Sequence, residues 1–263
     1  NHSIVTMKEI ERVAQLLADI NFVLITGGAN TRRVLRNVNR IAGALNYRCD
    51  IFYSFSAIIL TLYNNTTGEK ETVVKSIPHH GVNFNAISDI SILSWRILEK
   101  KLPINVIERE VAYIKGKSHY NMYLMWFFVS LAGGSLAYIF GGDHHNSYLE
   151  FGMSFLATLL GLAGRRILQL RKFNIFICWA WAAFISVSVV NGFRLLGVEE
   201  YKNALAACVL WLIPGVPLIN GFIDLLTGYV VAGIAKLAYA MMLIFMISIG
   251  FYLSLFIFGY ELL

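Results

Sequence analysis

Apolar side chains recur at helical spacing in two stretches near the beginning of the chain. Residues 9–24 carry the first stripe and residues 29–45 carry the second, beyond a Gly27-Gly28 break. The apolar positions are Val13, Leu16, Leu17, Ile20 and Leu24, and then Val34, Leu35, Val38, Ile41 and Leu45. An apolar residue every three or four positions is typical of an amphipathic helix packed on a core. We therefore expect two helices here, with the arginines of the second largely on its polar side.

Period-two alternation replaces the helical pattern over residues 48–63, where β-branched and aromatic residues dominate. This alternation predicts strand structure. Residues 64–68, Asn-Asn-Thr-Thr-Gly, predict a turn, and residues 71–77 predict a returning strand that Pro78 ends. Two polar-rich helices are expected over residues 86–101 and 103–117. Together these elements predict a small α+β domain.

The chain changes character at residue 120, after which its apolar runs are long enough to cross a bilayer. A spanning helix needs about 20 residues. Five segments qualify: residues 120–140, 148–164, 173–193, 204–226 and 237–260. Pro214 and Pro217 lie in the fourth, and each lacks a backbone donor and clashes with the preceding turn, so we expect this span to be broken. The predicted fold class is a membrane protein, with an α+β domain over residues 1–119 followed by a five-span helical domain over residues 120–263.

The composition supports this division. Of 263 residues, 57% are hydrophobic and 14% are charged, and the mean hydropathy is +0.61. An ordinary soluble domain is about 25% charged. Residues 1–119 contain 25 charged side chains, whereas the longer remainder contains 13. This pattern excludes a single soluble domain, a disordered chain and a fibrous protein.

Basic residues predict the orientation of the chain in the membrane. Residues 1–119 hold 15 of them, and the connection between the second and third spans holds Arg165, Arg166, Arg171 and Lys172. The connection between the first and second spans holds none. Because Lys and Arg concentrate in cytoplasmic loops, we expect a cytoplasmic N-terminal domain. Five spans then place the C-terminus outside.

Polar residues beside the predicted helix break are the main candidates for function. Asp224 lies one helical turn beyond Asn220, so both side chains are expected on one face. An ionised Asp near the bilayer centre costs roughly 2.5–3.5 kcal/mol, so such a residue is a candidate for a functional site. One interpretation is a discontinuous helix beside a substrate path, in which Pro217 opens the second half-helix. The other is a proline kink with Asp224 at the headgroup boundary.

The sequence around this break resembles the threonine/serine exporter family. Residues 214–224 read Pro-Gly-x-Pro-Leu-x-Asn-x-x-x-Asp, and Gly228 and Gly233 follow. Gly28-Ala29-Asn30-Thr31-Arg32-Arg33-Val34, Arg40-Ile41-Ala42 and Gly81-Val82-Asn83 resemble N-terminal motifs of that family. This chain has Asn30 where an acidic residue is common and His80 where Arg is usual.

The resemblance implies a multi-pass exporter subunit of the bacterial inner membrane rather than an enzyme. It implies small polar substrates, either a dicarboxylate such as succinate or threonine and serine. Long family members have a second membrane region, so this chain is similar to the split form that works with a separate small membrane subunit. The resemblance leaves open a homo-oligomer of that heteromeric complex. The residues assigned to the substrate pathway are Pro214, Gly215, Pro217, Asn220, Asp224, Thr227 and Gly228; those of the N-terminal motifs are Gly28, Thr31, Arg33, Arg40, Gly81 and Asn83. The chain is also expected to contact the lipid bilayer. We expect no cofactor, no metal ion and no nucleic acid.

Two other functions remain open. A membrane-anchored hydrolase would draw on His79 and His80 with Asp50, Ser54 and Ser56, although no Gly-x-Ser-x-Gly elbow is present. A regulatory membrane protein would use its N-terminal domain to sense a metabolite. The run Asp143-His144-His145 is interpreted as an exposed turn, because adjacent residues rarely converge on one metal ion.

Overall fold

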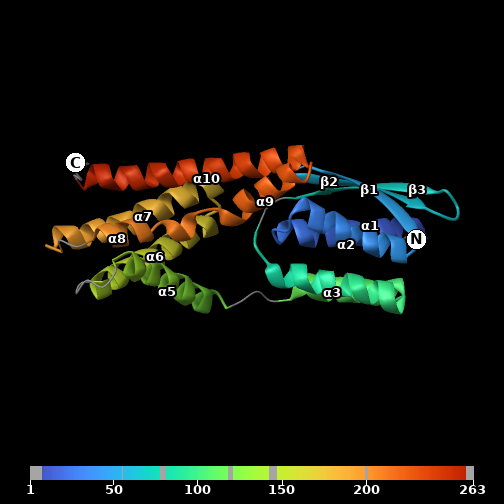
Figure 1. Cartoon of the computed structure of the whole chain (residues 1–263), viewed down its shortest axis with the longest axis horizontal. Coiled ribbons are helices and arrows are strands. Elements are labelled where there is room, and N and C mark those ends of the chain that lie inside the picture. The colour runs from blue at the N-terminus through green and yellow to red at the C-terminus, as the bar shows by residue number, and fades with distance from the viewer. Residues whose placement is uncertain are drawn as a thin grey trace, which may run out of the picture. The chain divides into compact units, whose positions relative to one another are not determined.

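The computed structural model describes residues 8–54, 56–77, 81–117, 121–141, 147–198 and 201–258 (Figure 1). The chain forms two compact units. The first contains Asn1–His119 and Gly215–Ala238, and the second contains Tyr120–Pro214 and Tyr239–Leu263. The first unit therefore combines the N-terminal domain with a short segment from the apolar part of the sequence.

A three-stranded antiparallel sheet forms the outer layer of the first unit. Its strands are β1 (Tyr47–Tyr53), β2 (Ala57–Asn64) and β3 (Lys70–Ser76), paired in the order β1-β2-β3. The single β stretch expected over residues 48–63 is thus two strands, because the chain reverses where the Ser54 N–H donates to the Ala57 carbonyl oxygen at 3.0 Å. Sequence reasoning missed this hairpin because the reversal carries no Gly, Asn or Pro signal.

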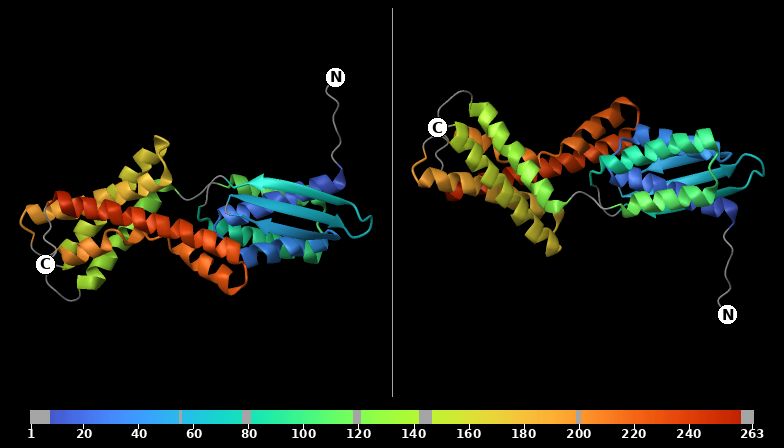
Figure 2. Two further views of the ribbon diagram at one scale, coloured as in Figure 1. Left: turned by 90° about the horizontal axis from the view of Figure 1, so that it is seen from above. Right: turned by 90° about the horizontal axis from the view of Figure 1, so that it is seen from below.

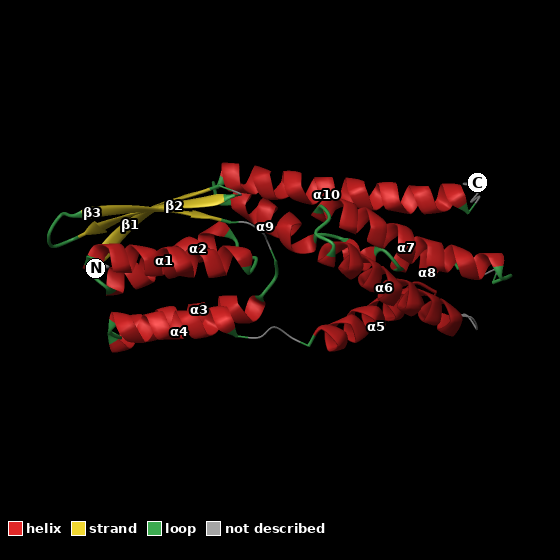
Figure 3. Cartoon of the chain, turned by 180° about the vertical axis from the view of Figure 1, so that it is seen from behind, coloured by secondary structure: helices red, strands yellow, loops and turns green. Residues whose placement is uncertain are grey.

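Four helices complete the N-terminal part of the first unit. The first two, α1 (Glu9–Thr26) and α2 (Thr31–Ala44), pack on one face of the sheet. The next two, α3 (Phe84–Lys100) and α4 (Ile104–Gly116), pack on α1 and α2, which gives three layers (Figures 2 and 3). All four helices lie within two residues of their predicted bounds. The predicted stripes form the core, in which Leu17, Ile20, Leu24 and Ile41 are fully buried.

Long apolar helices build the second unit. They are α5 (Met122–Gly141), α6 (Ser147–Leu170) and α7 (Ile175–Leu195), followed by the short α8 (Lys202–Ala207) and the 3-10 turn η1 (Leu210–Leu212). Small residues line their contacts. A Cβ at Gly133 of α5 would lie 2.5 Å from the Thr158 hydroxyl of α6, so these helices approach closely only because Gly133 has no side chain.

The chain leaves helical geometry between η1 and α9 (Gly215–Leu226), where Ile213 is extended with φ −60° and ψ 124°. The predicted break is therefore present. The second helical segment begins at Gly215, two residues earlier than expected, because Pro217 fits the first turn, where an N–H has no helical partner. Among the described residues, four helices are long and apolar enough to span a membrane, or up to five if this broken pair forms one span.

Two helices extend beyond the spans predicted for them. The α6 helix continues through Arg165 and Arg166 to Leu170, and α10 (Val230–Ile257) begins seven residues before the expected start and includes Lys236. Basic side chains are good helix formers and are favoured near a helix C-terminus, so the two arginines do not end α6. A single Lys likewise does not interrupt α10.

Candidate functional site

The two groups of motif residues meet inside the first unit. The α9 helix packs against α2 and the turn that precedes it (Figure 1). The Asn220 side-chain amide donates to the Gly28 carbonyl oxygen at 2.7 Å. Gly28 has φ +89°, which favours glycine, and a Cβ there would lie 3.2 Å from Val216. The glycine therefore permits both the turn and the close approach of α9.

Asp224 is the centre of the contact between α9 and α2. Its side chain is fully buried. One carboxylate oxygen accepts from the Thr31 N–H at 2.9 Å, and the other accepts from the Thr31 hydroxyl at 2.8 Å. Thr31 is the first residue of α2, whose N-terminal N–H groups carry partial positive charge. Asp224 thus supplies a negative charge where the start of α2 favours one.

Lys236 completes this cluster from the first turns of α10. Its ammonium nitrogen lies 2.5 Å from an Asp224 carboxylate oxygen, and 17% of its side chain is exposed. The same nitrogen lies 3.5 Å from the Thr31 hydroxyl. We call Thr31, Asp224 and Lys236 the carboxylate cluster. Sequence reasoning missed Lys236 because it lay just outside the predicted fifth span, although a lone ionisable residue between apolar segments is itself a functional signal.

A small cavity of about 190 Å³ adjoins the carboxylate cluster, with Thr31 in its wall. It lies beside the edge strand β1 and the beginning of α10. The residues that line it are Thr31, Leu35, Ile51, Phe52, Tyr53, Gly228, Tyr229, Val230, Val231 and Ala232. The Tyr53 hydroxyl lies 2.5 Å from the Asn21 side-chain oxygen, and burial raises the pKa of Tyr53, so this wall is uncharged.

The remaining predicted pathway residues shape the backbone around the cluster. Pro214 precedes α9, and Gly215 and Pro217 lie in its first turn. The Thr227 hydroxyl donates to the Ile223 carbonyl oxygen at 2.7 Å, and Gly228 has φ +87° in the turn between α9 and α10. None of these five side chains hydrogen-bonds the Asp224 carboxylate within the described part of the chain.

The other N-terminal motif residues organise the N-terminal domain itself. Arg40 donates to the Ser94 hydroxyl at 2.7 Å and lies 3.8 Å above the Trp95 ring. The Gly81 N–H donates to the Thr26 carbonyl oxygen at 3.0 Å, and the Asn83 N–H donates to that of Gly27 at 2.8 Å. These two bonds fix the beginning of α3 beside the turn that carries Gly28.

Arg33 differs from these motif residues. Its Nε atom is buried and has no hydrogen-bond partner among the described residues. The described partners of the Asp224 carboxylate are Thr31 and Lys236, not Arg33.

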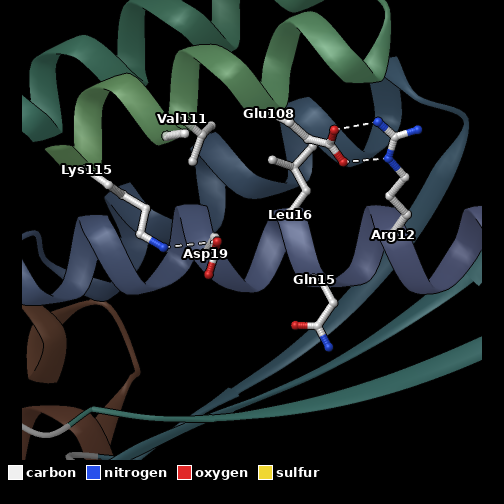
Figure 4. Close-up of a pocket in the computed structure, with 8 residues that line it drawn as sticks. Arg12, Gln15, Leu16, Asp19, Glu108, Val111 and Lys115 are labelled. Atoms are coloured by element: carbon white, nitrogen blue, oxygen red, sulfur yellow. Dashed lines mark hydrogen bonds and ion pairs between the residues drawn. The ribbon is translucent and has the colours of Figure 1, made fainter. Parts of the chain in front are cut away.

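A second groove lies between α1 and α4 (Figure 4). Arg12 donates to both Glu108 carboxylate oxygens, at 2.6 and 2.5 Å, and Asp19 pairs with Lys115 at 3.1 Å. The hydrogen bond from Arg12 holds the pKa of Glu108 below its usual range. These charges pair with one another across the groove. The described part of the groove therefore offers a ligand no unpaired charge.

Other candidates are not assembled in the described structure. His79, His80, Asp143, His144 and His145 lie outside the described residues. Within the described ranges, no group of three or more His, Cys, Asp or Glu side chains is arranged to hold a metal ion. Asp50 lies at an exposed position of β1 and pairs with Arg48 at 3.4 Å.

Comparison with known proteins places these motifs in a family. Residues 15–258 match the family described as "Putative threonine/serine exporter". A relative from Klebsiella aerogenes, named "Probable succinate transporter subunit YjjP", is 26% identical over 254 residues, which cover 95% of this chain and 96% of the relative. The protein of the same name from Escherichia coli strain K12 is 25% identical over 252 residues, which cover 94% and 95%. No solved structure matches the chain. Because the family match extends over nearly all residues, this chain belongs to the threonine/serine exporter family.

Proposed function

We propose that the chain is the larger membrane subunit of an exporter of small carboxylate-bearing metabolites, either a dicarboxylate such as succinate or threonine and serine. It works with a separate small membrane subunit in the bacterial inner membrane. The names of the two relatives, both succinate transporter subunits, support this proposal. The structural observation that carries it is the carboxylate cluster.

The cluster has the chemistry that a carboxylate substrate requires. The Lys236 ammonium and the N–H and hydroxyl groups of Thr31 are all donors, and they converge on one carboxylate, that of Asp224. A buried ion pair contributes little net stability relative to apolar packing, so its presence where α9 and α10 meet the beginning of α2 favours a functional role. A substrate carboxylate satisfies the same donors when it displaces Asp224.

This exchange suggests how transport is gated. While the Asp224 carboxylate accepts from Thr31 and pairs with Lys236, these contacts join α9 and α10 to the beginning of α2. When a substrate carboxylate takes over both Lys236 and the Thr31 donors, the Asp224 side chain is displaced from them, and α9 is free to move away from α2. The gating step is thus a competition between two carboxylates for one set of donors.

The topology is consistent with the cytoplasmic location of the N-terminal domain. In a five-span count, the connection between the fourth and fifth spans lies on the same side as the N-terminus. That connection is the turn between α9 and α10, and both of its flanks belong to the unit that contains the N-terminal domain. The excess of basic residues in this domain supports the cytoplasmic side.

The deciding experiment measures efflux from cells that express the chain with its small membrane partner and are loaded with succinate, threonine or serine. We expect export to require both subunits. Asp224→Asn keeps size but removes the charge, and Lys236→Met keeps length but removes the ammonium. Each is expected to lower the initial efflux rate per assembled complex at least tenfold, or about 1.4 kcal/mol.

Asp50→Asn is the matched control, because it makes the same chemical change at an exposed carboxylate and is expected to leave efflux unchanged. Membrane level and complex size are measured for every variant. Wild-type efflux by Asp224→Asn at every pH would leave the cluster as a structural contact only. Full export by the chain alone would contradict the two-subunit arrangement.

The hydrolase hypothesis is weaker. Both relatives are named as transporter subunits, and the Asp50 carboxylate pairs with Arg48. Turnover of a small ester by the full-length protein would favour this alternative.

A further inference from the structure

Arg165 forms a second polar centre, in the other unit of the chain. It lies five residues before the end of α6, a helix apolar enough to span a membrane. Its guanidinium carbon lies 5.0 Å from the centre of the Trp211 ring and 5.4 Å from that of Trp179. The side chain is half-buried, whereas that of the neighbouring Arg166 is exposed. Arg165 is therefore held by two indole rings rather than extended into a loop.

The donors of this centre have no acceptor among the described side chains. Within the described ranges, no carboxylate forms an ion pair with Arg165. The described acidic residue of this unit, Glu150, instead accepts from the backbone and side chain of Asn203, at 3.1 and 3.0 Å. The Trp211 Nε1 atom is buried and also has no hydrogen-bond partner among the described residues. A cation and a neighbouring N–H thus both lack a partner.

The missing component has a definite chemistry. Contacts with ring faces stabilise a cation but supply no acceptor oxygen. A desolvated guanidinium binds planar oxyanions through paired N–H groups, and an indole N–H donates one further hydrogen bond. A carboxylate satisfies both requirements.

The surrounding helices leave room for the Trp211 indole. A Cβ at Gly161 of α6 would lie 3.1 Å from the Trp211 ring and would overlap the Ser186 hydroxyl. Trp211 lies in η1, three residues before Pro214. A ligand held by Trp211 therefore contacts the segment that ends at the helix break.

We infer that Arg165 and the Trp211 indole N–H bind a carboxylate of the exported metabolite, with the Trp179 and Trp211 rings positioning the guanidinium. This inference rests on the proposed function and adds a binding site separate from the carboxylate cluster. A lipid phosphate offers the same oxyanion chemistry, so the test must distinguish the two sources.

The test uses the complex of both subunits in nanodiscs, made either of phosphatidylcholine alone or with phosphatidylglycerol. Succinate binding is measured by calorimetry, and succinate efflux is measured in cells. In neutral discs, Arg165→Gln is expected to weaken succinate binding at least tenfold. Arg165→Lys keeps the charge and is expected to raise the KM of efflux with little change in maximal rate. Trp211→Phe removes the N–H and leaves a smaller ring that still faces the guanidinium, and it is expected to weaken binding threefold to tenfold.

Arg166→Gln is the matched control and is expected to bind succinate as wild type does. Wild-type affinity in both Arg165 variants, with export intact, would overturn this inference and leave the proposed function standing. A phosphatidylglycerol effect that depends on Arg165, without any effect of Arg165 on succinate binding, would assign the site to lipid and also overturn it. Absence of both succinate binding and succinate export in the wild-type complex would overturn the inference. If threonine and serine are not exported either, the proposed function fails as well.

Discussion

The two units of the chain bury opposite kinds of side chain. The core of the first is made of large aliphatic residues, among them Leu17, Ile20, Ile90 and Leu93. The clusters of the second are rich in alanine, and many of its large apolar residues, such as Phe128, lie exposed. Water drives large side chains inward, whereas lipid exerts no such force and rewards close approach of small residues. The difference indicates that the first core forms in water and the second packs in lipid.

The largest expected effect is a cavity in the first core. Leu17→Ala removes a fully buried side chain from α1, and such changes cost about 2–5 kcal/mol. Hydrogen exchange of the α1 amides in the full chain measures the loss. Leu160→Ala on α6 is the comparison, because that side chain is 47% exposed. Equal effects of the two changes would contradict the distinction between the units.

Close packing in the second unit predicts a somewhat smaller loss of stability, caused by adding an atom rather than by removing several. In Gly250→Ala, the added Cβ would overlap the Ala180 carbonyl oxygen. Overpacking typically costs about 1–3 kcal/mol. We expect a lower midpoint of thermal unfolding in detergent and less assembled complex. Gly152→Ala is the control, since nothing lies within 4 Å of a Cβ there; equal stability of the two variants would argue against tight packing of α7 and α10.

An exposed aromatic side chain of the second unit is expected to matter little. Phe128 is 56% exposed, and Phe128→Ala is expected to change stability in detergent by no more than about 0.5 kcal/mol, as surface changes do. The measurement is the same thermal midpoint. A shift as large as that of Gly250→Ala would mean that Phe128 is covered in the assembled protein.

The smallest expected effect on stability at neutral pH concerns the thiol of Cys49 in the first core, which is tested by its labelling rate. Burial raises the pKa of Cys49 from its ordinary 9.0 to about 11, so its thiolate fraction at pH 8 is about 100-fold below that of an ordinary thiol. A variant with Cys178→Ala and Cys208→Ala isolates its rate of maleimide labelling. We expect slow labelling that urea accelerates.

The pH dependence of the free energy of unfolding follows from the same raised pKa of Cys49. The folded thiol keeps its proton longer than the unfolded one, so the free energy of unfolding falls as pH rises from about 9 to about 11. Replacing Cys49 with Ala removes this contribution to the pH dependence. Labelling as fast as that of a free thiol would contradict a buried Cys49.

Local patterns predicted the helices well because each carries its own periodicity and terminal signals. Asn30, for example, caps α2 by accepting from the Arg33 N–H at 2.8 Å. The hairpin after Tyr53 lacked a turn signal, and the arginines of α6 looked like the end of a span. The carboxylate cluster was predicted only in parts. Thr31 and Asp224 are 193 residues apart, and no local pattern reports that the two motifs touch.

That separation also sets an order of events during synthesis. Ribosomes add about 5–20 residues per second, so Thr31 emerges roughly 10–40 s before Asp224. During this interval the first N–H of α2 has no carboxylate to bind. The contact between α2 and α9 is therefore completed only after the fourth hydrophobic segment has been made, which places it late in the synthesis of the chain.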